Sequence, residues 1–451
     1  MKKSFRFIGC TFVCMSIFIF TGVLGSCSKK NKTPVVRYLN FKPEVANYYL
    51  QVASVYEEET GVKVIVETAA NNVYEAALSA KMSSKDAPTL FQLNGPRGYA
   101  NWKDYCADLS DTELYKHLSD KSLAITANGK VYGIPYVVEG YGIIYNKAIT
   151  DKYFALPSKA VKYTSMDQIN NFDALKAVVL DMQKNANKLG IDGVFACTSL
   201  KAGEDWRWQT HLTNIPITYE FMDNNVDLTS DSTKEITFEF GANYKNIFDL
   251  YLNNSTISRK LVGSKTVADS MAEFALEKCA MVQNGNWAWS QIAEVSGNKV
   301  LSENIRFLPI YTGMPGEENQ GLCIGTENFY AINAKASPED QKATADFIYW
   351  LYSSDVGKNF VTNLFGFIAP FDTFSQAETP KDPLAVEVVK WMEKPNIYSI
   401  PWNFTLFPSG KFKEDFGSSL LQYAQGAKSW YNVEKDMVYS WDKESNALAN
   451  N

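Results

Sequence analysis

The sequence predicts an α/β protein with two domains. Segments with strand-like and helix-like patterns alternate along the chain, and Gly61 and Gly190 end two of the helical segments. Alternation of this kind is typical of parallel sheets that are covered by helices. The chain has 451 residues, which is more than one hydrophobic core usually organises. We therefore expect two α/β domains.

The predicted elements follow the order strand, helix, strand, helix, strand. The hydrophobic pattern places strands at 35–41, 62–68 and 87–94, with helices at 43–60 and 71–84 between them. The alternation returns in the later segments, as a helix at 172–190, a strand at 192–199 and a helix at 337–354. In the last helix we expect Ser337 as the N-cap and Pro338 as the first helical residue.

The first 26 residues predict an export signal. MKKSFRF carries three positive charges, and an apolar run extends from there to Leu24. A transmembrane anchor is the alternative, because residues 7–25 are long enough to cross a bilayer. The small residues before Cys27, in LGSC, resemble a bacterial lipoprotein cleavage site. The resemblance implies cleavage before Cys27, a lipid on its sulfur, and a polar tether at 27–34 that holds the protein outside the cytoplasmic membrane.

The charge balance argues against nucleic acid as a partner. Removing Lys2, Lys3 and Arg6 with the signal leaves 41 basic and 50 acidic residues, a net charge of -9. An acidic chain repels the phosphate backbone.

Cysteine and histidine usage predicts no metal or cofactor. Four cysteines remain besides Cys27 and the two in the signal, and their apolar surroundings favour buried free thiols, with one or two disulfides as the alternative. They are Cys106, Cys197, Cys279 and Cys323. His117 and His211 have no second His or Cys at metal-ligand spacing, which leaves a calcium site of clustered Asp and Asn as the alternative.

Catalytic signatures are missing from the sequence. It contains no G-x-S-x-G, Walker, G-x-G-x-x-G or H-E-x-x-H motif. A catalytic pair of carboxylates can come from distant segments of the chain, so the number of acidic residues does not indicate whether the protein is a hydrolase. We therefore expect no catalytic residues and no enzyme activity.

Six segments together resemble the extracellular solute-binding proteins of carbohydrate ABC importers, the group that includes the maltose-binding proteins. They occur in the order of that family and are YEEETGVKVIVET, APTLFQLNGPRGYANWKDYCADLSD, VYGIPYVVEGYGIIYNKAI, LEKCAMVQNGNWAWSQI, LCIGTENFYAINAKASPEDQKATADFIYWL and FGFIAPF. Residues 153–270 match less well, so ligand contacts there are harder to assign.

This resemblance implies a type II periplasmic-binding-protein-like fold, in which two α/β lobes enclose a ligand cleft and the chain crosses between them several times. By analogy, the crossings fall near Val138–Tyr141, Leu308–Ile310 and Asn359–Phe365. The implied division is 35–138 with 311–361 for lobe 1, and 139–310 with 362–451 for lobe 2. Ligands of open α/β sheets bind beyond the carboxyl ends of the strands, which fits a site between two such edges.

Trp287 is the first candidate for ligand contact. CAMV predicts a short strand, Asn284-Gly285 a turn, and Asn286 the cap of a helix that begins with Trp287. Taken alone, a tryptophan in this position more often packs in a core. The resemblance implies instead that its ring stacks on a sugar, while Trp289 packs elsewhere.

Glu139 is the second candidate, because it interrupts an apolar run at the first predicted crossing. The resemblance implies that it accepts hydrogen bonds from sugar hydroxyls, and the alternative is a surface acid at a hinge. The implied site also includes Tyr141, from the same crossing.

Polar contacts are implied in the loops after the first and third strands. Lys42 matches best in the first loop, and Asn94 and Arg97 follow the third strand, where the family also supplies an Asp that this chain lacks. Solvated loop charges are the alternative for Lys42 and Arg97.

Two further tryptophans complete the expected site. Trp402 is assigned as a second stacking residue, although the match fits Phe404 as well. Trp206 is assigned as an aromatic contact, with burial in the core as the alternative. Trp350 lies in a strong helical pattern and predicts core packing.

The function implied by the resemblance is a lipid-anchored, extracytoplasmic receptor that captures a sugar or oligosaccharide by closing its cleft. We expect it to act as a monomer and to deliver the ligand to ABC permease subunits. The aromatic-rich, arginine-poor set of candidates favours a neutral sugar. The alternatives are a secreted carbohydrate-active enzyme and a binding protein for a non-sugar solute such as a polyamine.

Overall fold

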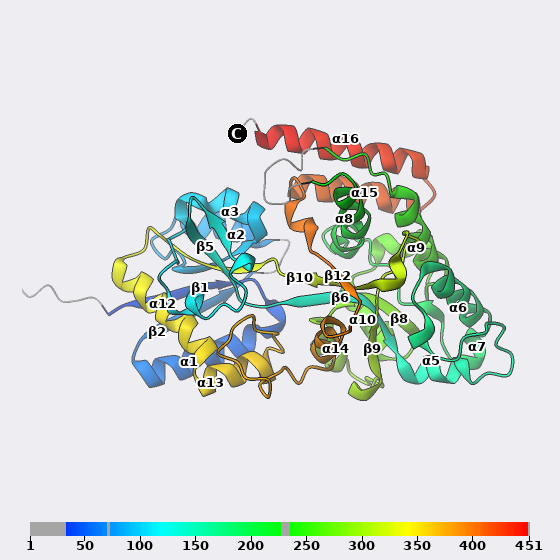
Figure 1. Ribbon diagram of the computed structural model, residues 1–451, viewed down its shortest axis with the longest axis horizontal. Helices are drawn as coiled ribbons and strands as arrows, with labels where there is room; N and C mark the ends of the chain where they lie inside the picture. Colours follow the sequence, from blue (N-terminus) through cyan, green and yellow to red (C-terminus); the bar gives the residue numbers. More distant parts are fainter. Residues whose placement is uncertain (1–32, 70–72, 227–234, 450–451) are drawn as a thin grey trace, which may run out of the picture. The chain divides into compact units, whose positions relative to one another are not determined.

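Two β-sheets organise the chain (Figure 1). The computed structural model describes residues 33–69, 73–226 and 235–449. The predicted signal at 1–26 and the lipidation site Cys27 lie outside the described residues. Within the described residues, none of the helices combines the length and the apolar character that a membrane span requires.

The first sheet has the strand order β2-β1-β3-β11-β5-β4. Its strands are β1 (Val35–Asn40), β2 (Lys63–Thr68), β3 (Leu90–Asn94), β4 (Ile125–Ala127), β5 (Lys130–Pro135) and β11 (Asn328–Ile332). β1 pairs in parallel with β2 and β3, as the alternation of strands and helices predicts. β11 pairs antiparallel with β3 and β5, which brings a late segment of the chain into the centre of this sheet.

Helices from the N-terminal part of the chain and from residues 338–364 lie around this sheet (Figure 1). They are η1 (Pro43–Val45), α1 (Ala46–Thr60), α2 (Tyr74–Met82), α3 (Gly95–Trp102), η3 (Lys103–Tyr105), α4 (Glu113–Lys116), η4 (Lys121–Leu123), α12 (Pro338–Ser353), α13 (Asp355–Asn359) and η10 (Phe360–Leu364). Ser337 accepts a hydrogen bond from the Asp340 N–H and Pro338 begins α12, so the predicted helix start is confirmed. Trp350 packs against Tyr56 in the core, as predicted.

The second sheet has the order β12-β10-β6-β8-β7, with β9 also paired to β6. Its strands are β6 (Glu139–Asn146), β7 (Gly193–Phe195), β8 (Cys279–Gly285), β9 (Ile305–Leu308), β10 (Gln320–Gly325) and β12 (Tyr398–Ile400). Every residue of β6 and β8 is buried. Burial on both faces explains why residues 141–145 and 279–282 of these strands carry no alternating polar residues.

The second sheet is surrounded by the remaining helices (Figure 1). They are α5 (Lys147–Phe154), η5 (Met166–Gln168), α6 (Phe172–Lys184), α7 (Ala186–Leu189), η6 (Arg207–Leu212), α8 (Thr213–Asp223), α9 (Gly241–Asn253), η7 (Arg259–Ser264), α10 (Val267–Ala275), α11 (Ala288–Ala293), η8 (Ser302–Asn304), η9 (Glu317–Asn319), α14 (Pro383–Met392), η11 (Asn403–Leu406), α15 (Gly410–Ala424) and α16 (Trp430–Ala449). The single helix predicted at 172–190 is divided at Asn185, whose side chain donates to the Asp181 carbonyl.

The first crossing between the sheets lies at residues 136–138, next to its predicted position. The second crossing was predicted near Leu308–Ile310, and this is wrong. The Glu317 carboxylate accepts hydrogen bonds from the N–H groups of Thr312 and Gly313, which folds this segment into a turn. The chain then returns as β10 in the second sheet, although the sequence division assigns 311–361 to the first lobe.

The chain crosses to the first sheet only after β10, at Thr326 and Glu327. The third crossing was predicted at Asn359–Phe365 and lies further on, because Phe367 and Phe371 still belong to the core of the first sheet. α14 then packs on the second sheet. The four described cysteines are buried free thiols.

Candidate functional site

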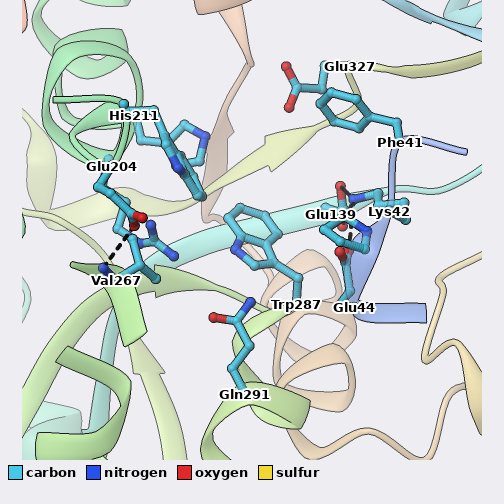
Figure 2. Close-up of a pocket in the computed structure, with 14 residues that line it drawn as sticks. Phe41, Lys42, Glu44, Glu139, Glu204, His211, Val267, Trp287, Gln291 and Glu327 are labelled. Atoms are coloured by element: carbon cyan, nitrogen blue, oxygen red, sulfur yellow. Dashed lines mark hydrogen bonds and ion pairs between the residues drawn. The ribbon is translucent and has the colours of Figure 1, made fainter. Parts of the chain in front are cut away.

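A cavity of about 210 Å³ is lined by residues from segments that adjoin the strands of both sheets (Figure 2). The loop after β1 supplies one side, and segments around β8 and η6 supply the other. Its lining includes Phe41, Lys42, Glu44, Glu139, Glu204, Trp206, Arg207, His211, Val267, Trp287, Gln291 and Glu327. Figure 2 shows Trp287 in the middle, between Lys42 with Glu139 on one side and His211 on the other.

A buried ion pair forms one wall of the cavity. Lys42 Nζ donates to both oxygens of Glu139, at 2.6 and 2.8 Å, and both side chains are almost fully buried. Asn328 Nδ2 also donates to Glu139, at 2.7 Å. Lys42 follows β1, Glu139 begins β6 and Asn328 begins β11. The network therefore connects β1 and β11 of the first sheet to the start of β6 in the second sheet.

Trp287 owes its position to a glycine. A Cβ on Gly285 would lie 2.2 Å from ring carbons of Trp287, so the indole rests directly on the strand backbone. The prediction that Asn286 caps the helix is wrong, because its Oδ1 accepts from the Gly140 N–H and its side chain makes no cap bond. Trp289 packs against the core of the second sheet, as predicted, and it also lines the second cavity described below.

Aromatic rings support Trp287 from behind. His211 stacks on Tyr141 with centroids 4.3 Å apart, and Tyr141 OH donates to the His211 carbonyl. Trp402 meets Trp287 edge to face at 6.3 Å, and Trp206 lies 6.0 Å from Trp287. These rings fix the orientation of the indole, as offset and edge contacts between aromatics do in general.

Charges around the cavity shift several pKa values. Burial acts to lower the pKa of Lys42, but Glu139 and Glu44 outweigh it and hold the pKa above its ordinary value. Burial raises the pKa of the Glu44 and Glu327 carboxyls. Burial, with help from Arg207, lowers the pKa of His211 well below its ordinary value, so its imidazole is neutral at pH 7.

Four of the residues expected from the sequence line this cavity. They are Trp287, Glu139, Lys42 and Trp206. Trp206 is half-buried rather than enclosed in the core. Tyr141 and Trp402 are buried among the aromatic rings that support Trp287 and are absent from the cavity lining.

Asn94 and Arg97 lie outside the cavity lining. Asn94 ends β3 and accepts from Gln92 Nε2, and Arg97 lies on α3. A Cβ at Gly95 would touch Thr405, so this edge of the first sheet lies against η11.

Sequence reasoning missed several lining residues, chiefly Arg207 and His211. Both belong to η6, a π-helix, and both are buried. The stretch DWRWQTH places these two ionisable side chains among tryptophans, and this was a usable signal, because an ionisable residue among large apolar ones needs a partner or a function.

A second cavity of about 320 Å³ adjoins the first. Trp287, Glu139 and Glu44 line both of them. The second one is completed by residues of α11 and of the segment that follows η10, such as Ser290 and Gly366. Together the two cavities extend the open space beside the indole. Among the described residues, no group of three or more His, Cys, Asp or Glu is placed to hold a metal ion.

Residues 51–388 match the family model of the bacterial extracellular solute-binding proteins. Curated relatives include a melibiose/raffinose/stachyose-binding protein, MelE, of Bacillus subtilis, with 29% identity over 25% of this chain and 27% of the relative. A maltooligosaccharide ABC transporter solute-binding lipoprotein of Streptococcus pneumoniae is 34% identical over 22% of this chain and 24% of the relative. The chain thus spans about a quarter of the length of these relatives in the matched regions.

Solved structures share the fold over almost the whole chain. The solute-binding protein RafE in complex with raffinose has a TM-score of 0.69 and 17% identity, and the match covers 92% of this chain and 100% of that one. A chitin oligosaccharide binding protein has a TM-score of 0.68 and 16% identity, with 92% and 98% covered. The predicted type II periplasmic-binding-protein-like fold, with two α/β lobes, is confirmed.

We predict that Gly285→Ala displaces the Trp287 indole. The new methyl group would occupy the space of the ring, while the backbone of β8 accepts alanine without strain. Near-ultraviolet circular dichroism should show the loss of the ordered tryptophan signal. Gly410→Ala is the matched control, because a Cβ there meets nothing within 4 Å and the spectrum should not change. A native spectrum for Gly285→Ala would contradict the packing of this ring.

Proposed function

This chain belongs to the bacterial extracellular solute-binding proteins, and from this premise we propose that it captures a sugar or oligosaccharide and delivers it to an ABC importer. The observation that carries the proposal is the half-buried Trp287 indole in the cavity, with hydrogen-bonding groups around it. We propose no chemical step: the ligand is bound and released intact.

The chemistry of the cavity suits a sugar. One face of a pyranose presents C–H groups that stack on an indole, and burying apolar surface is worth about 25 cal/mol per Å². The sugar hydroxyls point sideways and need polar partners, which Glu44, Gln291 and His211 can supply. Glu139 accepts three hydrogen bonds in the free protein, from Lys42 and Asn328, and a carboxylate can accept about four, so one position is open to a hydroxyl.

The relatives support a carbohydrate as the solute. MelE and the pneumococcal lipoprotein are named for oligosaccharides, and RafE was solved with raffinose. Two adjoining cavities that share Trp287 have room for more than one sugar ring. We propose Trp287 and Trp206 as the stacking residues, with Trp402 and Tyr141 as their support. Asn94 and Arg97 stay in the proposal as contacts for a longer ligand at the outer edge.

We propose that the solute is held by closure of two lobes, one around each sheet, acting as a monomer. Residues near 35–138 form most of the first lobe, and β10 moves the later boundary to about residue 326. Closure would exclude water from the sugar and give the permease one shape to recognise.

Small-angle X-ray scattering tests the closure. We expect a monomer whose radius of gyration falls when a bound sugar is added, because the lobes approach each other. The Trp287→Ala variant, which cannot hold the sugar, should keep the larger radius at the same sugar concentration. An unchanged radius in the native protein, with the ligand bound, would contradict closure.

Thermal-shift screening against mono- and oligosaccharides tests the function itself. A sugar at one hundred times its dissociation constant should add about 2.7 kcal/mol of stability. We expect Trp287→Ala to remove most of that shift and Trp287→Phe to keep part of it, since a phenyl ring offers a smaller stacking face.

Trp350→Ala is the matched control for this screen. Trp350 packs against Tyr56 and lies outside both cavities, so its loss should lower the melting temperature but preserve the shift caused by the sugar. A full shift in Trp287→Ala would contradict the role of this residue, and a native protein that responds to no sugar would contradict the function.

We propose that Cys27 carries a lipid that anchors the chain outside the cytoplasmic membrane. The LGSC sequence and the pneumococcal lipoprotein among the relatives support this. In a bacterium that processes lipoproteins and is grown with radiolabelled palmitate, the native chain should carry the label and Cys27→Ser should not, because the lipid is bound to the Cys27 sulfur. Cys106→Ser, which changes a buried thiol, should keep the label. A native chain without the label, or a labelled Cys27→Ser chain, would contradict the anchor.

A further inference from the structure

The Arg207 side chain is a buried cation that makes no hydrogen bond and no ion pair with the described residues. It lines the first cavity and is only 2% exposed. Its Nε, Nη1 and Nη2 atoms are all buried and make no hydrogen bond. Within the described part of the chain, no carboxylate oxygen forms an ion pair with it. Burying a charge without a partner is costly, so such a residue in a cavity indicates that a ligand completes it.

The geometry of the side chain leaves its donors available. The guanidinium carbon lies 3.9 Å from the centroid of the Trp206 ring, so the flat group stacks on the indole. Stacking uses the face of a guanidinium, whereas its N–H groups point outward in the plane. An arginine held in this way presents a rigid fork of donors, which matches two oxygens of a carboxylate or a sulfate.

The other unsatisfied buried atom of the cavity lining is also a donor. It is Trp287 Nε1, and with the three nitrogens of Arg207 it makes four donors without an acceptor. A ligand that fits this cavity must therefore supply oxygen acceptors. Neutral hydroxyls both donate and accept, whereas carboxylate and sulfate oxygens only accept.

The carboxylates of the cavity have positive or N–H partners of their own. Glu139 is bonded to Lys42, and Glu44 lies 3.6 Å from the same Nζ. Glu204 accepts from the Val267 N–H at 3.1 Å, the contact drawn in Figure 2. Lys413 and Lys42 attract Glu327. Glu204 attracts Arg207 electrostatically but accepts no hydrogen bond from it, so the Arg207 guanidinium is the charged group of the lining whose donors the described residues leave unused.

Resting on the proposed function, we propose that the ligand is an acidic sugar, whose carboxylate or sulfate group binds in the plane of the Arg207 guanidinium while a ring of the sugar stacks on Trp287. This replaces the neutral sugar expected from the sequence. The shared chemistry is an anionic group with two acceptor oxygens on a carbohydrate, which a uronic acid or a sulfated sugar provides.

Matched pairs of glycans test this proposal on the purified full chain. One arm compares oligosaccharides that contain glucuronic or galacturonic acid with the same oligosaccharides after reduction of the carboxyl to a hydroxymethyl group. The other arm compares sulfated oligosaccharides with their unsulfated parents. In isothermal titration calorimetry, the acidic member of at least one pair should bind at least ten times more tightly than its neutral partner. Whether this occurs in the uronic acid pairs or in the sulfated pairs identifies the anionic group as a carboxylate or a sulfate.

Arg207→Met provides the second measurement. Methionine keeps much of the length and removes the charge, so the affinity for the acidic glycan should fall tenfold or more and its advantage over the neutral partner should disappear. The melting temperature of the ligand-free variant should stay level or rise, because a buried unpaired charge is gone. Arg37→Met is the matched control, since Arg37 lies on β1 outside both cavities and its loss should leave the preference unchanged.

The outcomes separate this inference from the proposed function. If neutral and acidic partners bind the native protein equally well, the function stands and the acidic sugar is refuted. If Arg207→Met folds but loses neutral glycans as strongly as acidic ones, Arg207 binds hydroxyls and the inference is also refuted. If no glycan of either kind binds, the proposed function itself fails.

Discussion

The buried ion pair between Lys42 and Glu139 connects the two halves of the described chain and forms a wall of the site at the same time. Taking two charges out of water costs several kcal/mol for each ion, and their attraction repays this only with good geometry and further hydrogen bonds. Both conditions are met, because Lys42 bonds both carboxylate oxygens and Asn328 bonds one of them. The result is positional: the loop after β1 and the first residues of β6 and β11 are fixed to one another beside Trp287, whose ring lies 5.9 Å from Lys42 Nζ.

The tryptophan rings beside the site pack closely against the strand backbone at two positions where the residue is glycine. Gly285 lies under the Trp287 ring, and Gly325 lies under Trp402 in the same way, with its would-be Cβ 2.6 Å from the indole. β6 lies between these two strands, pairing with β8 on one side and β10 on the other. Both indoles therefore pack closely against the backbone at the end of the second sheet, and His211 contacts each of them. Larger residues at the two glycines would push the rings out and close the cavity.

Patterns that act within a few residues made the elements and the family predictable. The glycine end of α1, the Ser337 and Pro338 start of α12 and the parallel pairing of β1 with β2 and β3 follow from local preferences and hydrophobic periodicity. The position of β10 was not predictable in this way. Its sheet is set by the turn that Glu317 holds through backbone N–H groups and by antiparallel pairing with β6, about 180 residues earlier in the chain.

The same distinction between local pattern and tertiary structure applies to the site. The residue types were readable from the chain, because Trp287 and Glu139 stand out in motifs that resemble known sugar-binding proteins. Their surroundings were not. Asn286 bonds Gly140 rather than capping its own helix, and Lys42 forms a buried pair with a residue 97 positions away. The Arg207 side chain is left without a hydrogen-bond acceptor. These outcomes come from burial and from which side chains meet across the fold, and no local pattern encodes them, since the energy of a charge or a donor is set by the groups that surround it in space.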